Sequence, residues 1–312
     1  MTSYHCFSHA KDCDGLMSAA IFLRAHPESS VTLVDYGAKN IERMVGRMKE
    51  ALSPGCYISI SDFSLNKSTS SAVFGGLAEA KKAGATMLWV DHHRWTVEQQ
   101  AELRRYAGLR LDTSRCAAEA MKDIYAPTDQ VASALASMAH DTDFAVMERP
   151  LSRYLSGIIV YYNYLADHDR LLGLVKKFSR GTLWDADLEK DWDAYDGAKG
   201  LAVDELKGAM FTSKVGGVTV AVGSCRSVLP PLEAFDMMAG AELGIVLYED
   251  DTLTILRSEG SSVPCNEIAE RFRGGGHPFA AGGSLPEELA REGAESKADY
   301  IFKVVGSAIG KA

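Results

Sequence analysis

The sequence predicts an α/β protein with an N-terminal doubly wound, mainly parallel sheet and a smaller C-terminal α/β domain with a mixed sheet. In the first third of the chain, short apolar runs alternate with helical patterns, which is typical of a parallel sheet covered by helices on both faces. In the last third, apolar runs flank the acidic turn 249–251, which indicates antiparallel pairing. With 312 residues, the chain is long enough for two domains.

Five strands with helices between them are expected before residue 112. The predicted strands are residues 4–7, 31–34, 56–61, 86–90 and 109–111. The predicted helices are residues 15–26, 41–52, 73–82 and 97–106. These helices have apolar residues three or four positions apart, and Pro27 ends the first of them.

The rest of the chain is expected to be helical first and mixed afterwards. Residues 148–180 have a helical pattern, and the acidic stretch 185–196 is interpreted as a solvated helix face or a connector. Further strands are predicted at 218–222, 243–248 and 253–256, with helices at 232–238 and 264–272. The expected organisation is a first domain at 1–190, a linker at 191–215 and a second domain at 216–312.

Charge and cysteine usage exclude several classes of protein. The net charge of −9 argues against binding to long duplex nucleic acid, because that requires an extended basic surface. Six cysteines without a CxxC pair are expected to be reduced packing thiols. Charges interrupt the N-terminal apolar stretch, and the longest apolar run, 154–166, is too short to span a bilayer. We therefore expect a cytoplasmic protein without a membrane partner, and the sequence leaves a homodimer open.

An imidazole or a carboxylate stands where each predicted strand of the first domain ends. These residues are His9, Asp35, Asp62, Asp91 and Asp112. Because the carboxyl ends of parallel strands share one edge of a sheet, where ligands bind, we expect their side chains to converge. Acidic residues after strands also cap helices, and that is the alternative for each of them taken alone.

Further carboxylates and imidazoles follow two of these residues, His9 and Asp91, closely in the sequence. Asp12 and Asp14 follow His9 within five residues, and His92 and His93 are adjacent after the fourth strand. Helix capping explains neither an imidazole beside two carboxylates nor two adjacent histidines. Oxygen and imidazole ligands suit Mn²⁺ or a similar divalent ion better than an ion that prefers thiolates. The sequence therefore predicts a divalent-metal site at this edge.

These motifs resemble the DHH phosphoesterase superfamily, which holds family II pyrophosphatases, RecJ-type exonucleases, nano-RNases and cyclic-dinucleotide phosphodiesterases. The resemblance is carried by His-x-x-Asp-x-Asp-Gly at 9–15, the aspartate at 62 and Asp-His-His at 91–93. Residues 112–119 resemble the segment after this triplet in the nano-RNase branch, and residues 140–144 resemble the fourth acidic motif. One departure is a spacing of two residues, where many members have three, between the first histidine and the first aspartate.

The resemblance implies two divalent metal ions, with Mn²⁺ preferred over Mg²⁺ and Co²⁺. One ion would be held by His9, Asp12 and Asp62. The other would be held by Asp14, Asp62, His92 and Asp141, so that Asp62 bridges the two. Asp141 is preferred to Asp143 because Asp-Thr matches the commoner form of the fourth motif. A water activated by both ions would then attack the phosphate.

Two more residues receive roles from the resemblance. His93 would face the substrate phosphate, and Asp91 would orient the histidine pair from behind. With Asp62, these residues form the predicted catalytic set.

A glycine-rich stretch in the last third is the predicted substrate grip. The candidate substrate-binding residues, besides His93, are Arg257, Ser258, Gly274, Gly275, Gly276 and His277. Consecutive glycines free the backbone to form an anion-binding nest, whereas a plain turn after a helix is the alternative for the glycines alone. Gly-Gly-Gly-His-Pro-Phe-Ala-Ala-Gly resembles the DHH-associated C-terminal domain, in which the Arg-Ser and Gly-Gly-Gly-His motifs grip the substrate. Arg273 stands where many relatives have a fourth glycine.

The predicted function is a Mn²⁺-dependent phosphodiesterase or phosphatase for short nucleotides. Nano-RNA, 3′-phosphoadenosine 5′-phosphate and linear or cyclic dinucleotides are the candidate substrates. The first domain would be catalytic, and the second would bind substrate. A polyphosphatase or pyrophosphatase, or a nucleotide-binding regulatory module without catalysis, are the alternatives. The sequence has no GxxxxGK[ST] loop, which argues against a nucleotide-driven motor.

Overall fold

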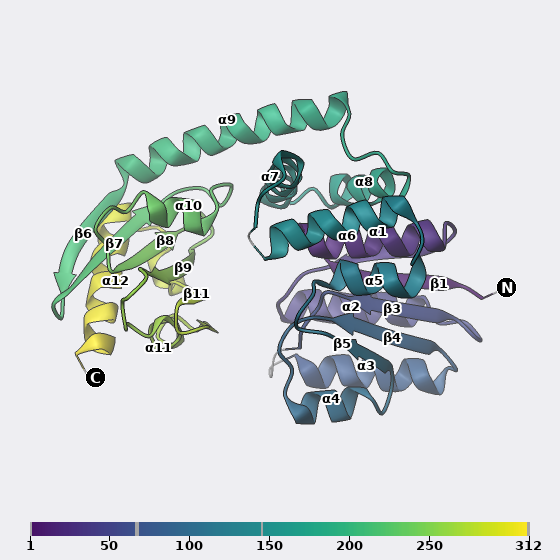
Figure 1. The fold of residues 1–312 in the computed structure, drawn as a ribbon. Helices are drawn as coiled ribbons and strands as arrows, with labels where there is room; N and C mark the ends of the chain where they lie inside the picture. The colour runs from purple at the N-terminus through teal and green to yellow at the C-terminus, as the bar shows by residue number, and fades with distance from the viewer. Residues whose placement is uncertain (1, 66–68, 145, 311–312) are drawn as a thin grey trace. The chain divides into compact units, whose positions relative to one another are not determined.

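The computed structural model describes residues 2–65, 69–144 and 146–310, and the chain divides into two compact units (Figure 1). The first unit is Met1–Asp193 and the second is Ala194–Ala312. The α/β class, the parallel sheet of the first unit and the mixed sheet of the second confirm the fold predicted from the sequence.

A parallel five-stranded sheet organises the first unit, in the order β2-β1-β3-β4-β5. Its strands are β1 (Tyr4–His9), β2 (Ser30–Val34), β3 (Tyr57–Ser61), β4 (Thr86–Asp91) and β5 (Gly108–Leu111). From β1 the chain continues to β2, which pairs with one edge of β1, and then crosses over to β3, which pairs with the other edge. Strand order therefore reverses between β1 and β3, and in sheets of this kind ligands bind at the carboxyl ends of the two strands at that point.

Helices cover both faces of this sheet, with α3 and α4 on one side and α1, α5 and α6 on the other (Figure 1). The helices of this unit are α1 (Cys13–Ala25), α2 (Ala38–Glu50), α3 (Ser70–Lys82), α4 (Val97–Leu103), α5 (Ala117–Tyr125), α6 (Gln130–Asp143), α7 (Pro150–Tyr164) and α8 (His168–Ser179). Successive residues of β1 enter different cores: Cys6 packs with α1 and α5, whereas Phe7 packs with α2 and α3. A strand buried on both faces is what its continuous apolar run predicts.

The second unit contains a mixed six-stranded sheet in the order β10-β11-β9-β8-β7-β6. Its strands are β6 (Met210–Val215), β7 (Val218–Ser224), β8 (Leu243–Leu247), β9 (Thr252–Arg257), β10 (Gly275–Gly276) and β11 (Ala280–Ser284). Its helices are α10 (Pro231–Asp236), α11 (Cys265–Glu270), the 3₁₀ turn η1 (Glu287–Leu289) and α12 (Ala294–Ile309). The acidic turn 249–251 joins β8 to β9, which pair antiparallel as expected.

The stretch 191–215, which we expected to be a linker, is regular structure. It contains the larger part of α9 (Ala186–Gly208), which crosses the boundary between the units, and then β6. Gly197 and Gly200 both lie within this helix, and a Cβ at either would meet nothing within 4 Å. In the described part of the chain, no helix is both long and apolar enough to cross a membrane.

Candidate metal centre

The first motif connects the end of β1 to the start of α1. His9 is the last residue of β1, and Asp12 is the N-cap of α1, where its carboxylate accepts a hydrogen bond from the N–H of Gly15 at 3.0 Å. A Cβ on Gly15 would lie 2.2 Å from the carbonyl oxygen of His9. Glycine at this position therefore allows the helix to begin directly against the strand that carries the histidine.

Asp62 directly follows β3 and has a strained backbone. Its φ is 51°, in the left-handed region that residues other than glycine rarely adopt, and its N–H donates to the carbonyl of Val90 at 3.0 Å. The residue is 1 % exposed, and its carboxylate lies 3.7 Å from Nδ1 of His9. That same nitrogen is 3.1 Å from the carboxylate of Asp12. Strain of this kind is found at functional sites, where the surrounding structure holds it in place.

His92 brings the second half of the site to Asp62. Its Nε2 lies 3.3 Å from Oδ1 of Asp62 and 3.6 Å from Oδ2 of Asp14. Its Nδ1 lies 3.6 Å from the carboxylate of Asp143. The carboxyl ends of β1, β3 and β4 thus bring residues that are far apart in the sequence within contact of one another, as the sequence predicted.

Asp14 is held by the first turn of α5. Its two oxygens accept hydrogen bonds from the N–H groups of Ala117 and Ala118, both at 2.7 Å. These two donors were not predicted from the sequence. A signal was present, because Cys116 and Glu119 form the ends of a capping box that marks a helix start. The positive end of the helix dipole also favours the carboxylate form of Asp14.

The carboxylate of Asp91 contacts both residues of the histidine pair and one tryptophan. Its Oδ1 accepts from the N–H of His92 at 2.9 Å and contacts Nδ1 of His93 at 2.7 Å. Its Oδ2 accepts from the indole N–H of Trp95 at 2.6 Å, a partner that no sequence motif indicated. Both oxygens of Asp91 thus have protein partners, and Asp91 also offers a ligand atom within 4.8 Å of those of Asp62, His92 and His93.

The fourth motif differs from the prediction. Asp141 points away from the cluster, and its oxygens accept hydrogen bonds from the N–H groups of Glu148 and Arg149 at 3.0 and 3.2 Å, ahead of α7. Asp143, to which Asp141 was preferred on sequence grounds, lies beside His92 instead. The structure therefore brings Asp143, and not Asp141, into the cluster.

Two strand-end acids also stay outside the cluster. Asp35, after β2, forms an ion pair with Lys11 at 3.2 Å. Asp112, after β5, accepts from Ser114 and forms an ion pair with Arg115 at 3.1 Å. Both follow edge strands of the sheet, away from the point where the strand order reverses.

Close packing of like charges shapes the protonation of the cluster. Burial raises the pKa of Asp14 well above its usual range, and the carboxylate of Asp62 raises it further. Burial lowers the pKa of His9, but the hydrogen bond with Asp12 and the negative charges of Asp12 and Asp62 together outweigh it and raise the value to about 10. For His92, burial also lowers the pKa, but the contact with Asp62 and the negative charges of Asp14 and Asp143 together raise it to about 9. Without a metal, protons on the imidazoles thus compensate the crowded carboxylates.

The donor set fits divalent cations. His9, Asp12 and Asp62 offer ligand atoms within 4.8 Å of one another, and so do Asp14, His92 and Asp143. Among the described residues, Oδ2 of Asp62 and Nε2 of His92 are shielded from solvent and have no hydrogen-bond partner. Buried polar atoms without a partner are costly, and a cation bound between these groups would satisfy them.

The candidate substrate residues of the second unit gather on one hairpin and the strand beside it. Gly275 and Gly276 form β10 and pair with β11, so the glycines make a short strand rather than the open nest we expected. Gly274 is required by close packing, since a Cβ there would lie 1.8 Å from the carbonyl oxygen of Gly282. Arg273 has a φ of 56°, in the left-handed region that glycine adopts most readily.

His277 lies in the turn between β10 and β11, and Arg257 is the last residue of the neighbouring strand β9. The ring of His277 is exposed and stacks on Phe279 with 5.2 Å between centroids. The N–H of Arg257 donates to the carbonyl of Phe279 at 3.3 Å, and its guanidinium donates to Val263 at 3.2 Å. The N–H of Ser258 donates to the carbonyl of Glu242 at 3.1 Å.

Comparison with solved structures identifies a related fold over the whole chain. A pGpG-specific phosphodiesterase, PggH, from Vibrio cholerae is similar with a TM-score of 0.60 and 12 % identity, covering 98 % of this chain and 100 % of that one. The chain therefore shares its overall fold with this phosphodiesterase. An uncharacterized protein from Helicobacter pylori G27 aligns with a TM-score of 0.46 and 15 % identity over both full chains. No protein-family model and no curated protein matches the chain.

Proposed function

We propose that this protein is a metal-dependent phosphodiesterase that hydrolyses short nucleotides. The observation that carries the proposal is the convergence of carboxylates and imidazoles from β1, β3, β4 and α6 on Asp62, in a DHH-type fold. PggH, whose fold is similar, is a pGpG-specific phosphodiesterase, and this similarity supports a dinucleotide as substrate class. The net charge of −9 argues against long nucleic acids.

Two divalent ions, with Mn²⁺ preferred, are assigned to the two donor groups. His9, Asp12 and Asp62 would hold one ion. Asp14, Asp62, His92 and Asp143 would hold the other, with Asp143 replacing Asp141 in the set predicted from sequence. Bound there, the ions would activate a water as nucleophile and stabilise the charge that develops on the phosphate.

His93 would contact the substrate phosphate. Its Nδ1 is held by Asp91, and its side chain is 36 % exposed, so Nε2 remains available to a ligand. Burial lowers the pKa of His93, but the hydrogen bond to Asp91 and the negative charges of Asp91 and Asp62 together raise it above the usual value. A protonated ring would donate a charge-assisted hydrogen bond to a phosphate oxygen.

The second unit would bind the substrate. Arg257 and His277 offer donors for phosphate oxygens, and Gly274 to Gly276 keep the hairpin free of side chains that would obstruct a ligand. We assign Ser258 to the same group because it directly follows Arg257. On this view the first unit is catalytic and the second recognises the nucleotide.

The direct test is product analysis. Purified protein with Mn²⁺ is incubated with pGpG, 3′-phosphoadenosine 5′-phosphate, short RNA oligonucleotides and polyphosphate. Mononucleotide or phosphate should be released from the short nucleotides in preference to polyphosphate. Asp62→Asn should be inactive, and Asp112→Asn, an acid outside the cluster, should remain active. Release from polyphosphate alone would favour the pyrophosphatase alternative, and tight binding without any product would favour a regulatory module.

A further inference from the structure

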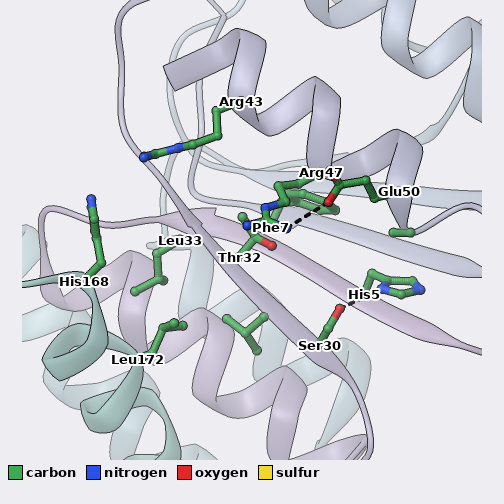
Figure 2. Close-up of a pocket in the computed structure, with 12 residues that line it drawn as sticks. His5, Phe7, Ser30, Thr32, Leu33, Arg43, Arg47, Glu50, His168 and Leu172 are labelled. Carbon is green, nitrogen blue, oxygen red and sulfur yellow. Dashed lines mark hydrogen bonds and ion pairs between the residues drawn. The ribbon is translucent and has the colours of Figure 1, made fainter. Parts of the chain in front are cut away.

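A cavity on the first unit lies away from the metal centre, between α2, β2 and α8 (Figure 2). Its volume is about 470 Å³, within the range of sites for small molecules. A second cavity of about 190 Å³ adjoins it and shares Arg43 and His168 as wall residues. None of the metal-centre residues lines either cavity.

One wall of the cavity carries positive charge. Arg43 and Arg47 stand one helical turn apart on α2. Arg47 forms an ion pair with Glu50 at 2.9 Å. Arg43 contacts the side-chain oxygen of Asn40, at 3.3 Å, and forms no ion pair with a carboxylate of the described residues. Its guanidinium is therefore available to an anion. In Figure 2, His168 of α8 lies at the same end of the cavity as Arg43.

The remaining walls offer hydrogen bonds and an apolar surface. Strand β2 is an edge strand bonded to β1 alone, so some of its backbone N–H and C=O groups are left without a partner strand where it lines the cavity. Ser30 adds a hydroxyl, which contacts His5 at 2.6 Å (Figure 2). Leu33 and Leu172 face the same space from β2 and α8. Apolar walls with a few directed polar groups are typical of small-molecule sites.

We infer that this cavity is a second binding site, for a phosphorylated small molecule of nucleoside monophosphate size. The phosphate would pair with the guanidinium groups of Arg43 and Arg47, since planar guanidinium groups bind phosphate in bidentate fashion. The flat apolar part of the ligand would lie against Leu33 and Leu172, with hydrogen bonds to the edge of β2. This site goes beyond the proposed hydrolysis and does not depend on it.

Calorimetric titration with 5′-AMP and 5′-GMP tests the inference. Divalent ions are removed with EDTA, and the protein carries Asp62→Asn, so that the metal centre contributes no binding. Saturable binding is expected, and Arg43→Gln should weaken it about tenfold through loss of one charge-assisted contact. Arg104→Gln, at the exposed end of α4, is the matched control and should bind as before. Adenosine without phosphate should bind at least about tenfold more weakly than AMP.

Hydrogen exchange then locates the site. Bound nucleotide should slow exchange of amides in 30–34 and 38–50 in the EDTA-treated protein. The inference is overturned if neither nucleotide binds at millimolar concentration, or if Arg43→Gln and Arg104→Gln bind equally well. Protection confined to the second unit would overturn it too. Because no step of this experiment measures hydrolysis, its failure is distinguishable from failure of the proposed phosphodiesterase activity.

Discussion

Replacement of Gly15 by alanine tests whether the close approach of α1 to β1 builds the metal centre. The new Cβ would lie 2.2 Å from the carbonyl oxygen and 2.8 Å from the Cβ of His9, whereas ordinary contacts begin near 3.4 Å. Both obstacles are parts of the strand end rather than of a flexible side-chain tip. Either α1 or the end of β1 must therefore move by about 1 Å.

The expected cost follows from this overlap. Overpacking of this kind destabilises by about 1–3 kcal/mol, and the gain in helix propensity from glycine to alanine offsets about 0.5–1 kcal/mol. The net loss in the free energy of unfolding should be about 1–2 kcal/mol. A displacement of about 1 Å in His9 and Asp12 should also lower the turnover rate about 100-fold.

Gly75→Ala is the matched control. Gly75 lies within α3, and a Cβ there would meet nothing within 4 Å, so this variant should be unchanged or up to about 1 kcal/mol more stable. Urea unfolding gives the stability of both variants, and calorimetric titration gives their Mn²⁺ affinity. If Gly15→Ala kept wild-type stability and Mn²⁺ affinity, the proposed origin of the site geometry would be wrong.

Three further predictions concern the ions. Asp143→Asn should weaken Mn²⁺ binding at least about tenfold with little change in stability. Asp141→Asn should lose about 1 kcal/mol of stability and retain its Mn²⁺ affinity. The reverse pattern would identify Asp141 as the metal ligand, as predicted from the sequence. Because the pKa values of His9 and His92 are raised to about 10 and about 9, both rings are protonated at neutral pH without metal. Metal binding must displace these protons, so affinity should increase as pH rises towards the pKa of His92, and calorimetry in buffers of different ionisation enthalpy should detect proton release. EDTA should abolish hydrolysis and added Mn²⁺ should restore it, while activity that survives exhaustive chelation would contradict the metal role.

The sequence was sufficient to predict the sheet and the convergence on Asp62, because strand ends that follow buried apolar runs share one edge. It could not predict which strand ends lie at the centre of that edge. Asp35 and Asp112 also follow strands, but β2 and β5 are the outer strands of the sheet. The order of the strands depends on how helices from distant parts of the chain pack against the sheet, and local sequence patterns contain no information on this packing.

The fourth motif shows a second limit. Asp141 and Asp143 lie two positions apart in the last turn of α6, so they point to different sides of the helix. Only the packing of α6 decides which of them faces His92. In the same way, Gly197 and Gly200 lie within α9, because a glycine lowers helix propensity by only about 1 kcal/mol and keeps its backbone N–H.

Anomalous diffraction at the manganese edge, from crystals grown with Mn²⁺, tests the central claim most directly. We expect two peaks about 3.5–4 Å apart, with the carboxylate of Asp62 between them and His9 and His92 on opposite sides. Manganese bound elsewhere, with Asp62 still contacting both imidazoles directly, would contradict the assignment of this cluster as the metal centre.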